Sequence, residues 1–441
     1  MDVVLLSRLQ FALAACFHFI FPPLTLGITL IIVYLEAVYY KKGDEKYKLL
    51  STFAIKILGL IFTIGVATGI VLEFSFGTNW SSYSRLVGDI FGAPLAAEGV
   101  FAFFLESFFI AILLFGREKV SKKVFLFSAI MVCFASHMSG FWIIIANSWM
   151  QTPAGFKLIG DKVVLTSFFD AAFNPSTIVR YVHTILGAWI TGSLFLAGIS
   201  SWYLLKDRDR DLFEPMLKIS LIIFILTSFA QFGSGHAHAV QVAKTQPEKM
   251  AAFEGLWKTQ KGAPLSVFGI PSEKDEKTYL EIGIPKLLSW MIYMDGNATI
   301  KGLKDFPKKE RPPVIIPFWS YHFMIWLGSL YAGLAFLGII LLWRKKLYTF
   351  KPFLWGLLLA SPLPILTNEF GWIAAEVGRQ PWAVYKILLT ADAASKVVPA
   401  WQILFSMIMF AVVYTLFFFI FMVLLIQTIK KGPRDIGTDQ Y

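Results

Sequence analysis

Charged residues stand close together at the end of an apolar run, in the stretch 367–382 that reads T-N-E-F-G-W-I-A-A-E-V-G-R-Q-P-W. Glu369 and Glu376 are seven residues apart, so on an α-helix they face within about 20° of each other, roughly 10 Å apart along the axis. A charge at bilayer depth costs at least about 2.5–3.5 kcal/mol, so acids in such a segment are functional candidates. An interfacial Glu376–Arg379 pair is the alternative, but it explains the two acids together poorly. The stretch predicts a polar or metal-containing site inside a helix bundle.

A second pair of acids lies at the start of another apolar run, P-L-A-A-E-G-V-F-A-F-F-L-E-S (94–107). On an α-helix Glu106 would lie about 12 Å deeper than Glu98 and about 80° around the axis. With Glu369 and Glu376 these acids would gather in the outer half of the bundle, and carboxylates at descending depth resemble a proton relay. The alternative for each is a buried acid held by a neighbouring Ser, Tyr or Lys.

A histidine and a methionine lie at matching depths on two further apolar runs. His183 follows the start of one run near Ile178 by about one to two turns, and Met324 follows the start of another near Pro317 by about two turns. Axial His and Met ligands are typical of a low-spin, electron-transferring haem. Each residue alone has a simpler interpretation, because a lone buried His is often a hydrogen-bonded core residue and Met often fills gaps.

His18 lies in F-H-F-I-F-P-P-L-T-L-G (17–27), just before two prolines that interrupt the helical hydrogen-bond ladder. The interruption opens the backbone near the histidine. Both a metal ligand and a core histidine fit this pattern, and periodicity leaves the two open.

The composition is that of a polytopic membrane protein. Of 441 residues, 56% are hydrophobic and 16% are charged, and the mean hydropathy is +0.64. The net charge of +11 comes from basic residues in short loops, which act as topology signals rather than as a nucleic-acid surface. Cys16 and Cys133 lie inside apolar runs and no C-x-x-C-H is present, so neither a disulfide framework nor covalently attached haem is expected.

We therefore expect an all-α bundle of about nine transmembrane helices, each long enough for a hydrocarbon layer of roughly 30 Å. The expected spans are 11–38, 53–73, 94–115, 124–146, 179–204, 217–235, 317–343, 353–376 and 402–427.

Basic residues set the orientation of these spans. If nine helices alternate, five basic clusters fall on one side, whereas the connections on the other side, such as 74–93, are poor in Lys and Arg. The positive-inside rule then places the N-terminus outside and the C-terminus in the cytoplasm. The clusters are Lys41, Lys42, Lys46 and Lys48; Arg117, Lys119, Lys122 and Lys123; Lys206, Arg208 and Arg210; Arg344, Lys345, Lys346 and Lys351; and Lys430, Lys431 and Arg434.

One outer connection, 236–316, is much longer than the others and is rich in Lys, Glu, Gly and Pro. Loops of this length in a compact protein are usually functional. The expected organisation is helices 1–6 in 1–235, an outer loop in 236–316 and helices 7–9 in 317–441.

Taken together, these segments resemble subunit I of the cytochrome bd family of quinol oxidases, from end to end and in family order. The matching segments are S-R-L-Q-F (7–11) with His18, G-V-A-T-G (65–69), E-F-S-F-G-T-N-W (73–80), G-D-I-F-G-A-P-L-A-A-E-G (88–99), F-F-L-E-S (103–107), A-N-S-W-M-Q-T-P (146–153), V-H-T (182–184), Q-P-E-K-M-A-A-F-E (246–254) and G-R-Q-P-W (378–382).

The resemblance implies three haems and their ligands. His183 and Met324 would be the axial ligands of a low-spin haem b, in agreement with their depths. His18 would bind the iron of one of two high-spin haems and Glu376 that of the other, with the individual pairings left open. These would be a haem b and a haem d, or a third haem b in place of haem d. Glu98 would lie against the same di-haem site and is a further candidate iron ligand.

The resemblance also implies roles for residues that hold no iron. Glu106, Ser107 and Ser139 match the pathway that brings protons from the cytoplasmic side. Lys249 and Glu254 correspond to quinol-binding residues of the outer loop. Arg379 would hold haem propionates or serve the electron path. Trp372 would lie between haems.

Four histidines depart from the family pattern or match none of its ligands. His322 stands where many members carry Arg, and a neutral imidazole there would change the charge beside the low-spin haem. His236 and His238 open the loop, which is of the short form; they are candidate quinol ligands, but surface loop histidines are the favoured interpretation. His137 matches no ligand position and is expected to pack in the core.

The activity implied is oxidation of ubiquinol or menaquinol at the outer face and reduction of O2 to water, with protons taken from the cytoplasm so that turnover is electrogenic. The expected setting is a prokaryotic cytoplasmic membrane, with a second large subunit and a small single-helix subunit as partners. Three alternatives are a di-haem quinone-reactive anchor, which would need His pairs; a proton-coupled transporter, which would predict an inverted repeat that we do not find; and a non-catalytic paralogue.

Overall fold

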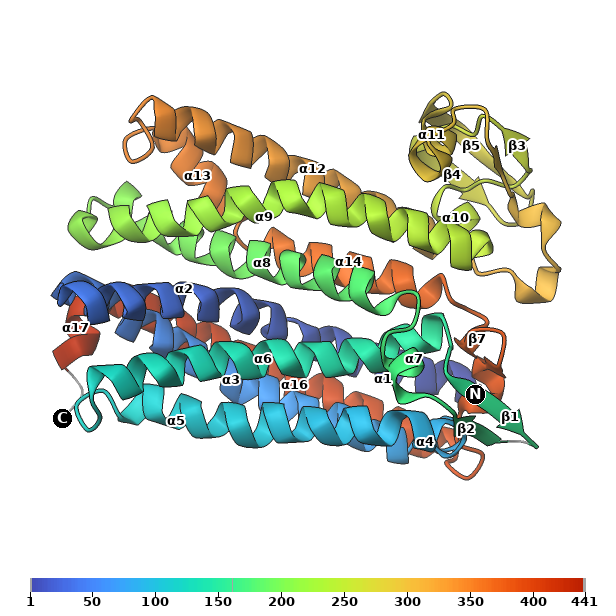
Figure 1. The fold of residues 1–441 in the computed structure, drawn as a ribbon, viewed down its shortest axis with the longest axis horizontal. Coiled ribbons are helices and arrows are strands. Elements are labelled where there is room, and N and C mark those ends of the chain that lie inside the picture. The colour runs from blue at the N-terminus through green and yellow to red at the C-terminus, as the bar shows by residue number, and fades with distance from the viewer. Residues whose placement is uncertain (1, 161, 439–441) are drawn as a thin grey trace.

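Long helices that run side by side dominate the computed structural model, which describes residues 2–160 and 162–438 (Figure 1). Within these residues, eight spans are long and apolar enough to cross a membrane, and a pair of helices bent by 40° makes a ninth. The prediction of about nine spanning helices is confirmed. The spans are Val3–Phe19 (α1) with Phe21–Lys42 (α2), Glu45–Gly77 (α3), Ser81–Glu98 (α4) with Gly99–Glu106 (η1) and Ser107–Phe115 (α5), Lys122–Gln151 (α6), Thr177–Leu205 (α8), Arg210–Thr245 (α9), Ile315–Trp343 (α12), the bent pair Lys351–Ala360 (α13) and Leu363–Val377 (α14), and Ala400–Lys431 (α16).

The expected connection at 74–93 is wrong, because most of it is helical. Helix α3 continues to Gly77 and α4 begins at Ser81, which leaves a three-residue turn, Thr78–Trp80. The side chains of α4 that face the protein form an apolar stripe with helical spacing, although the segment as a whole is too polar to stand out in hydropathy. The stripe consists of Tyr83, Val87, Ile90 and Phe91.

The helices begin and end at residues suited to those positions. The Asp44 carboxylate accepts a hydrogen bond from the Lys46 amide, 3.0 Å, at the start of α3, and Ser121 accepts one from the Val124 amide at the start of α6. Gly43 ends α2 with φ +67°, a left-handed conformation that glycine adopts without steric penalty. Pro22 lies in the first turn of α2, where no intrahelical amide bond is lost.

Helix α8 lies at the centre of the bundle and packs against α2, α9 and α13. Its approach to α2 is close because two glycines face each other. A Cβ on Gly27 would lie 2.7 Å from the Cα of Gly192, and one on Gly192 would lie 2.5 Å from the Cα of Gly27. Small residues allow such close helix packing in membranes. Larger side chains at either position would separate the two helices.

The first and last spanning helices are neighbours. Gln10 of α1 donates a 2.6 Å hydrogen bond to Ser406 of α16, and the rings of Phe17 and Tyr414 stack with centroids 4.5 Å apart. The two chain ends nevertheless lie at opposite ends of the bundle (Figure 1), as an odd number of crossings requires.

A buried ion pair ties two helices and a turn together at the bundle end opposite the long loop. The Arg117 guanidinium lies 2.6 Å from the Glu36 carboxylate, and both side chains are nearly inaccessible to solvent. Arg117 also donates a 2.6 Å hydrogen bond to Ser51 and lies over the Phe125 ring. This pair joins α2, α3 and the turn after α5.

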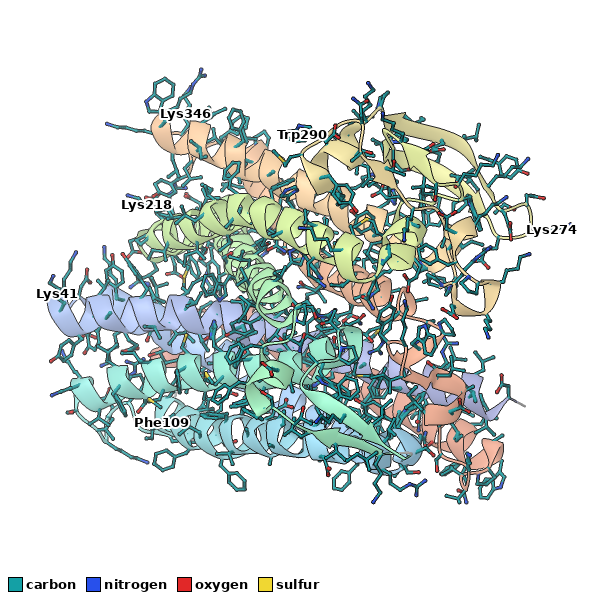
Figure 2. The ribbon with its side chains drawn as sticks, turned by 45° about the vertical axis from the view of Figure 1, so that its right-hand side comes forward. Lys41, Phe109, Lys218, Lys274, Trp290 and Lys346 are labelled. Atoms are coloured by element: carbon teal, nitrogen blue, oxygen red, sulfur yellow. The ribbon has the colours of Figure 1, made fainter. Side chains whose placement is uncertain are left out.

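The long connection folds into a compact unit over the ends of α9 and α12 (Figure 1). Lys274 and Trp290 lie in this unit, whereas Lys41 and Lys346 lie at the opposite end of the bundle (Figure 2). Because α9 continues to Thr245, past the expected end at 235, the unit begins at Gln246. Its elements are Pro247–Phe253 (α10), Gln260–Lys261 (β3), Leu265–Ser272 (β4), Lys277–Ile284 (β5), Leu287–Tyr293 (α11), Thr299–Ile300 (β6), Leu303–Asp305 (η2) and Lys308–Glu310 (η3).

All described strands pair antiparallel in two-stranded sheets, β1–β2, β3–β6, β4–β5 and β7–β8. The remaining short elements cap the bundle ends. They are Phe156–Ile159 (β1), Lys162–Leu165 (β2), Phe168–Ala172 (α7), Trp382–Val384 (β7), Leu388–Leu389 (β8), Thr390–Ala393 (α15) and Pro433–Thr438 (α17).

Candidate functional site

His183 on α8 faces α9 and has a defined tautomer. Its Nδ1 lies 3.1 Å from the Ser234 hydroxyl, which donates its own hydrogen to the Gln231 carbonyl at 3.0 Å. With that hydrogen on the carbonyl, a proton on Nδ1 lets the ring donate to Ser234, and the Nε2 lone pair then faces the Gln231 amide. A long contact of 3.4 Å joins Nε2 to the Gln231 amide. His183 thus has the arrangement of a metal-binding histidine, whose second nitrogen donates to an oxygen.

His18, in the last turn of α1, has the same arrangement. Its Nδ1 lies 3.0 Å from the Thr68 hydroxyl of α3, and that hydroxyl donates to the carbonyl of Ile64 at 2.8 Å. In the tautomer that carries its proton on Nδ1, the lone pair of Nε2 is available to a metal.

Two other histidines use both ring nitrogens within the protein. His137 hydrogen-bonds the Cys133 carbonyl through Nδ1 at 2.7 Å, and its Nε2 accepts from the Trp189 indole at 2.9 Å. The expectation that His137 is a core residue is confirmed. In His322, Nδ1 lies 2.8 Å from the Phe318 carbonyl and Nε2 lies 3.1 Å from the Ser266 carbonyl. His322 therefore ties α12 to the loop unit and has no free nitrogen for a metal.

The interpretation of His236 and His238 as surface loop histidines is wrong. Both lie on α9, which continues beyond the expected span. The His238 ring lies edge-on to the His183 ring, with centroids 5.4 Å apart. His238 is thus a direct neighbour of a candidate haem ligand.

Three of the candidate ligands, His18, His183 and Met324, each face a glycine on a neighbouring helix. A Cβ on Gly69 would lie 3.1 Å from the His18 ring, one on Gly235 would lie 3.4 Å from the His183 ring, and one on Gly371 would lie 3.1 Å from the Met324 sulfur. Side chains in place of these glycines would crowd the ligands. The donor chemistry and these cradles fit haem iron held by His and Met.

Glu376 is the centre of a buried polar network. Its Oε1 accepts hydrogen bonds of 3.1 Å from Asn147 and of 3.1 Å from Gln151, and its Oε2 accepts one of 2.6 Å from Arg379. Arg180, which also donates to Asn147, lies 3.9 Å from Oε1. The guanidinium groups of Arg379 and Arg180 therefore stabilise the Glu376 carboxylate as an anion.

Unpaired guanidinium nitrogens in this network are suited to a further anion. Nε and Nη1 of Arg379 and Nε of Arg180 are buried and have no hydrogen-bond partner within the described residues. Trp372 lies beside them, with its ring 5.5 Å from the Arg180 guanidinium and 5.4 Å, edge to face, from the Phe19 ring. Haem propionates are anions that such nitrogens would satisfy.

The other acids do not form one cluster with Glu376. Glu369 lies on the same helix, α14, but hydrogen-bonds Cys16 of α1. Glu98 has Glu73 of α3 as a charged neighbour. The structure assigns separate partners to acids that the sequence grouped together.

Glu106 is buried and hydrogen-bonds a serine of a neighbouring helix. Its carboxylate accepts a 2.6 Å hydrogen bond from Ser136 of α6, whereas neither Ser107 nor Ser139 hydrogen-bonds it within the described residues. Residues Gly99–Glu106 form a π-helix, so the rotation of about 80° expected from α-helical geometry does not apply. Ser136 is the hydroxyl that the sequence alone did not identify.

Lys249 of α10 points into the bundle rather than toward solvent. Its amine donates to Gln151 Oε1 at 2.5 Å and to Gln246 Oε1 at 2.8 Å. Burial lowers the pKa of the Lys249 amine well below its ordinary value. A short bond between the Tyr385 hydroxyl and the Glu248 carboxylate, 2.6 Å, holds the same helix from another side.

Glu254 follows α10 and faces α12 and the β4 strand. Its Oε2 accepts a 2.9 Å bond from the Ser266 amide, Tyr321 also hydrogen-bonds the carboxylate, and Oε1 is buried without a partner in the described structure. Burial raises the pKa of Glu254 to about 8. A carboxyl with this pKa can exchange a proton near neutral pH.

Sequence reasoning missed several residues of the site. Arg180 stands three residues before His183 inside a spanning helix, so the argument applied to the acids would have found it. Asn147 and Gln151 lie in the segment 146–153 and carry no charge, so no signal singled them out individually.

Comparisons with known proteins all point to the same family. The model of the family described as cytochrome bd terminal oxidase subunit I matches residues 6–433. The chain is 38% identical to cytochrome bd ubiquinol oxidase subunit 1 of Bacillus subtilis, over 98% of this chain and 95% of that protein. It is 34% identical to cytochrome bd-II ubiquinol oxidase subunit 1 of Escherichia coli, over 100% and 98%. The solved structure of bd oxidase from Geobacillus thermodenitrificans superimposes with a TM-score of 0.91 at 29% identity, over 98% of this chain and 99% of that chain.

Proposed function

Because this chain belongs to the cytochrome bd terminal oxidase subunit I family, we propose that it carries the haems of a bacterial membrane oxidase that oxidises quinol and reduces O2 to water. The terminal quinol oxidase role follows from the family, as do haem cofactors and a subunit II partner. The roles of individual residues, the haem types and the path of protons are the substance of the proposal.

One observation carries the proposal. In His18 and His183, Nδ1 lies against a hydroxyl that also hydrogen-bonds a carbonyl of its own helix, an arrangement that favours the tautomer with Nε2 as the ligand atom. His137 and His322 lack this arrangement. This contrast supports His18 and His183 as the iron ligands of the proposal.

We assign the haem-binding residues accordingly. His183 and Met324 would hold a low-spin haem b, and His18 and Glu376 would serve the two high-spin haems, with Glu98 beside them. Arg379 and Arg180 would neutralise propionates. When bound, the haems supply one-electron transfer and the reduction of O2, with haem d or a third haem b at the oxygen site.

The loop unit would supply the quinol site. Quinol oxidation releases protons, and the Glu254 carboxyl, with its raised pKa, is suited to accept one. Lys249 is turned toward Glu376 and would act from the inner side of α10 rather than by direct contact with bulk solvent.

Glu106 and Ser136 would deliver protons for water formation. The hydroxyl of Ser136 both donates to Glu106 and lies on α6, which begins at the end of the bundle opposite the loop unit. The basic side chains at that end, among them Lys41 and Lys346 (Figure 2), favour its placement in the cytoplasm. Proton uptake there and release at the loop would make turnover electrogenic in a cytoplasmic membrane. Lipid, subunit II and a small single-helix subunit would cover the exposed apolar helix faces.

A reduced-minus-oxidised optical spectrum of the purified membrane complex, with pyridine haemochrome extraction and quinol-driven O2 uptake, tests the proposal. We expect a low-spin b band, a high-spin signal and O2 uptake that requires quinol. A far-red chlorin band would assign haem d, and b-type bands alone would assign a third haem b. Haem without O2 uptake would favour a quinone-reactive anchor, and a well-folded complex without haem would favour the transporter alternative.

A further inference from the structure

Gln151 joins two residues that sequence reasoning assigned to different functions. It is the last residue of α6 and is only 1% exposed. Its Oε1 accepts the 2.5 Å bond from the Lys249 amine of the loop unit, and its Nε2 donates the 3.1 Å bond to the Glu376 carboxylate of α14. One side chain thus bridges the loop and the candidate haem site.

The chemistry of the amide explains why glutamine occupies this position. An amine offers donors, and a carboxylate offers only acceptors. The amide meets both at once, with its oxygen toward Lys249 and its nitrogen toward Glu376. The reversed orientation would place two donors against each other and two acceptors against each other, so the neighbours fix the amide in one orientation.

Other contacts hold both ends of the bridge. Gln246 takes a second bond from the Lys249 amine, and the Ala375 carbonyl lies 3.5 Å from the Gln151 nitrogen. The backbone amide of Tyr385 donates to the Met150 carbonyl, one residue before Gln151, at 2.9 Å. The end of α6 is therefore fixed against both the loop and the segment that follows α14.

We propose that Gln151 is a positioning residue that makes the Lys249 amine and the Glu376 carboxylate one hydrogen-bonded unit, so that a change in the quinol-side loop alters the environment of the haem that Glu376 serves. This inference rests on the proposed function, because it takes Glu376 as a haem ligand. Gln151 would then connect the quinol-side loop to the haem site that Glu376 serves.

A double-mutant cycle on the purified complex tests the connection, with haem midpoint potentials from optical redox titration as the readout. The variants are Lys249→Met, Gln151→Leu and the double variant. We expect Lys249→Met to change the redox equilibrium of one high-spin haem by about tenfold, which is about 59 mV for a one-electron couple. In the Gln151→Leu background the same change should be less than about twofold, because the bridge is already broken.

Two further variants keep the test decisive. Gln151→Asn retains a buried amide but is too short to span both partners, so it should reproduce the coupling loss of Gln151→Leu. Gln241→Leu removes a glutamine of α9 that bonds Thr245 within its own helix, and it should leave the Lys249→Met shift unchanged.

The outcomes separate this inference from the proposed function. Normal haem content with additive shifts in the cycle would overturn the role of Gln151 and leave the oxidase assignment standing. Absence of haem from the wild-type complex would refute the proposed function instead. Loss of both Gln151 variants from the membrane would assign Gln151 to assembly and would also overturn the inference.

Discussion

The Ser136 hydroxyl donates a 2.6 Å hydrogen bond to the Glu106 carboxylate across the contact between α6 and the π-helix η1. The same hydroxyl lies 2.8 Å from the Val132 carbonyl of its own helix. Ser136 therefore presents an oxygen to a buried acid at a fixed place in the bundle.

Replacing Ser136 by Ala should slow quinol-driven O2 uptake by about tenfold or more, since hydrogen bonds to charged groups contribute about 1.5–3 kcal/mol. Haem content and reduced spectra should stay normal, because the hydrogen bonds of Ser136 within the described residues go to Glu106 and to the Val132 carbonyl rather than to a candidate iron ligand. Ser139→Ala, three residues further along α6, is the matched control and should be close to wild type. A larger loss with Ser139→Ala would restore the assignment that sequence alone suggested.

Gly371→Ala should disturb the low-spin haem. The new Cβ would lie 3.1 Å from the Met324 sulfur, closer than ordinary van der Waals contact, so the sulfur must move. We expect a weakened or shifted low-spin band in the reduced-minus-oxidised spectrum, and Met324→Leu should abolish it. Gly356→Ala on α13 is the control, because its Cβ meets only the Leu334 side chain at 3.7 Å within the described residues. An unchanged spectrum in Met324→Leu would exclude this ligand.

Glu254 predicts a pH dependence of quinol oxidation. With its pKa raised to about 8 by burial, the ionised form that accepts a proton becomes more abundant as pH rises through about 8. The rate should therefore rise between about pH 6 and about pH 9, and Glu254→Gln should lower the rate and flatten the profile. A wild-type profile that is already flat across this range would remove Glu254 as the base.

The Glu254 carboxyl also makes the stability of the fold depend on pH, and its contribution falls as the pH rises. Its ordinary pKa is 4.5, so between about 4.5 and 8 the folded state binds a proton that the unfolded state releases. Stability from this group is greatest below that range and declines as pH rises through it. Thermal unfolding of wild type and Glu254→Gln at the two ends of the range would measure the difference.

Arg117→Ala should destabilise the bundle by about 3–5 kcal/mol, because it leaves the Glu36 carboxylate buried without its charge partner. Thermal unfolding of the detergent-solubilised complex measures the effect. Arg210→Ala is the control at the same end. Its ion pair with Glu214 is partly exposed, so its loss should change stability by no more than about 1 kcal/mol. Equal melting of the two variants would show that Glu36 finds another partner.

The sequence predicted how deep a residue lies along its helix, but not which residue of a neighbouring helix its side chain faces. The apolar runs located the spans, and Nδ1 of both His18 and His183 faces a hydroxyl on a neighbouring helix. The choice of Ser136 over Ser139 depends on the rotation of η1 against α6, and a π-helix alters that rotation without a recognisable sequence signal.

Polar residues within helices explain two other wrong predictions, the connection at 74–93 and the end of a span at residue 235. Helix α4 is amphipathic rather than uniformly apolar, so hydropathy treated it as a connection. The polar residues after 235 suggested a loop, although α9 continues through His238 and brings it against His183. The bridge through Gln151 depends on three segments far apart in sequence, which no local pattern encodes.

The pairing of α1 with α16 has a consequence for biogenesis. Gln10 and Ser406, which hydrogen-bond, are 396 residues apart, so at about 5–20 residues per second a ribosome needs roughly 20–80 s to supply the second partner. Until then α1, which carries His18, lacks the neighbour that closes its side of the bundle. We therefore expect stable haem loading at His18 to follow the insertion of the last helix, and the nascent subunit to reach the membrane without this cofactor.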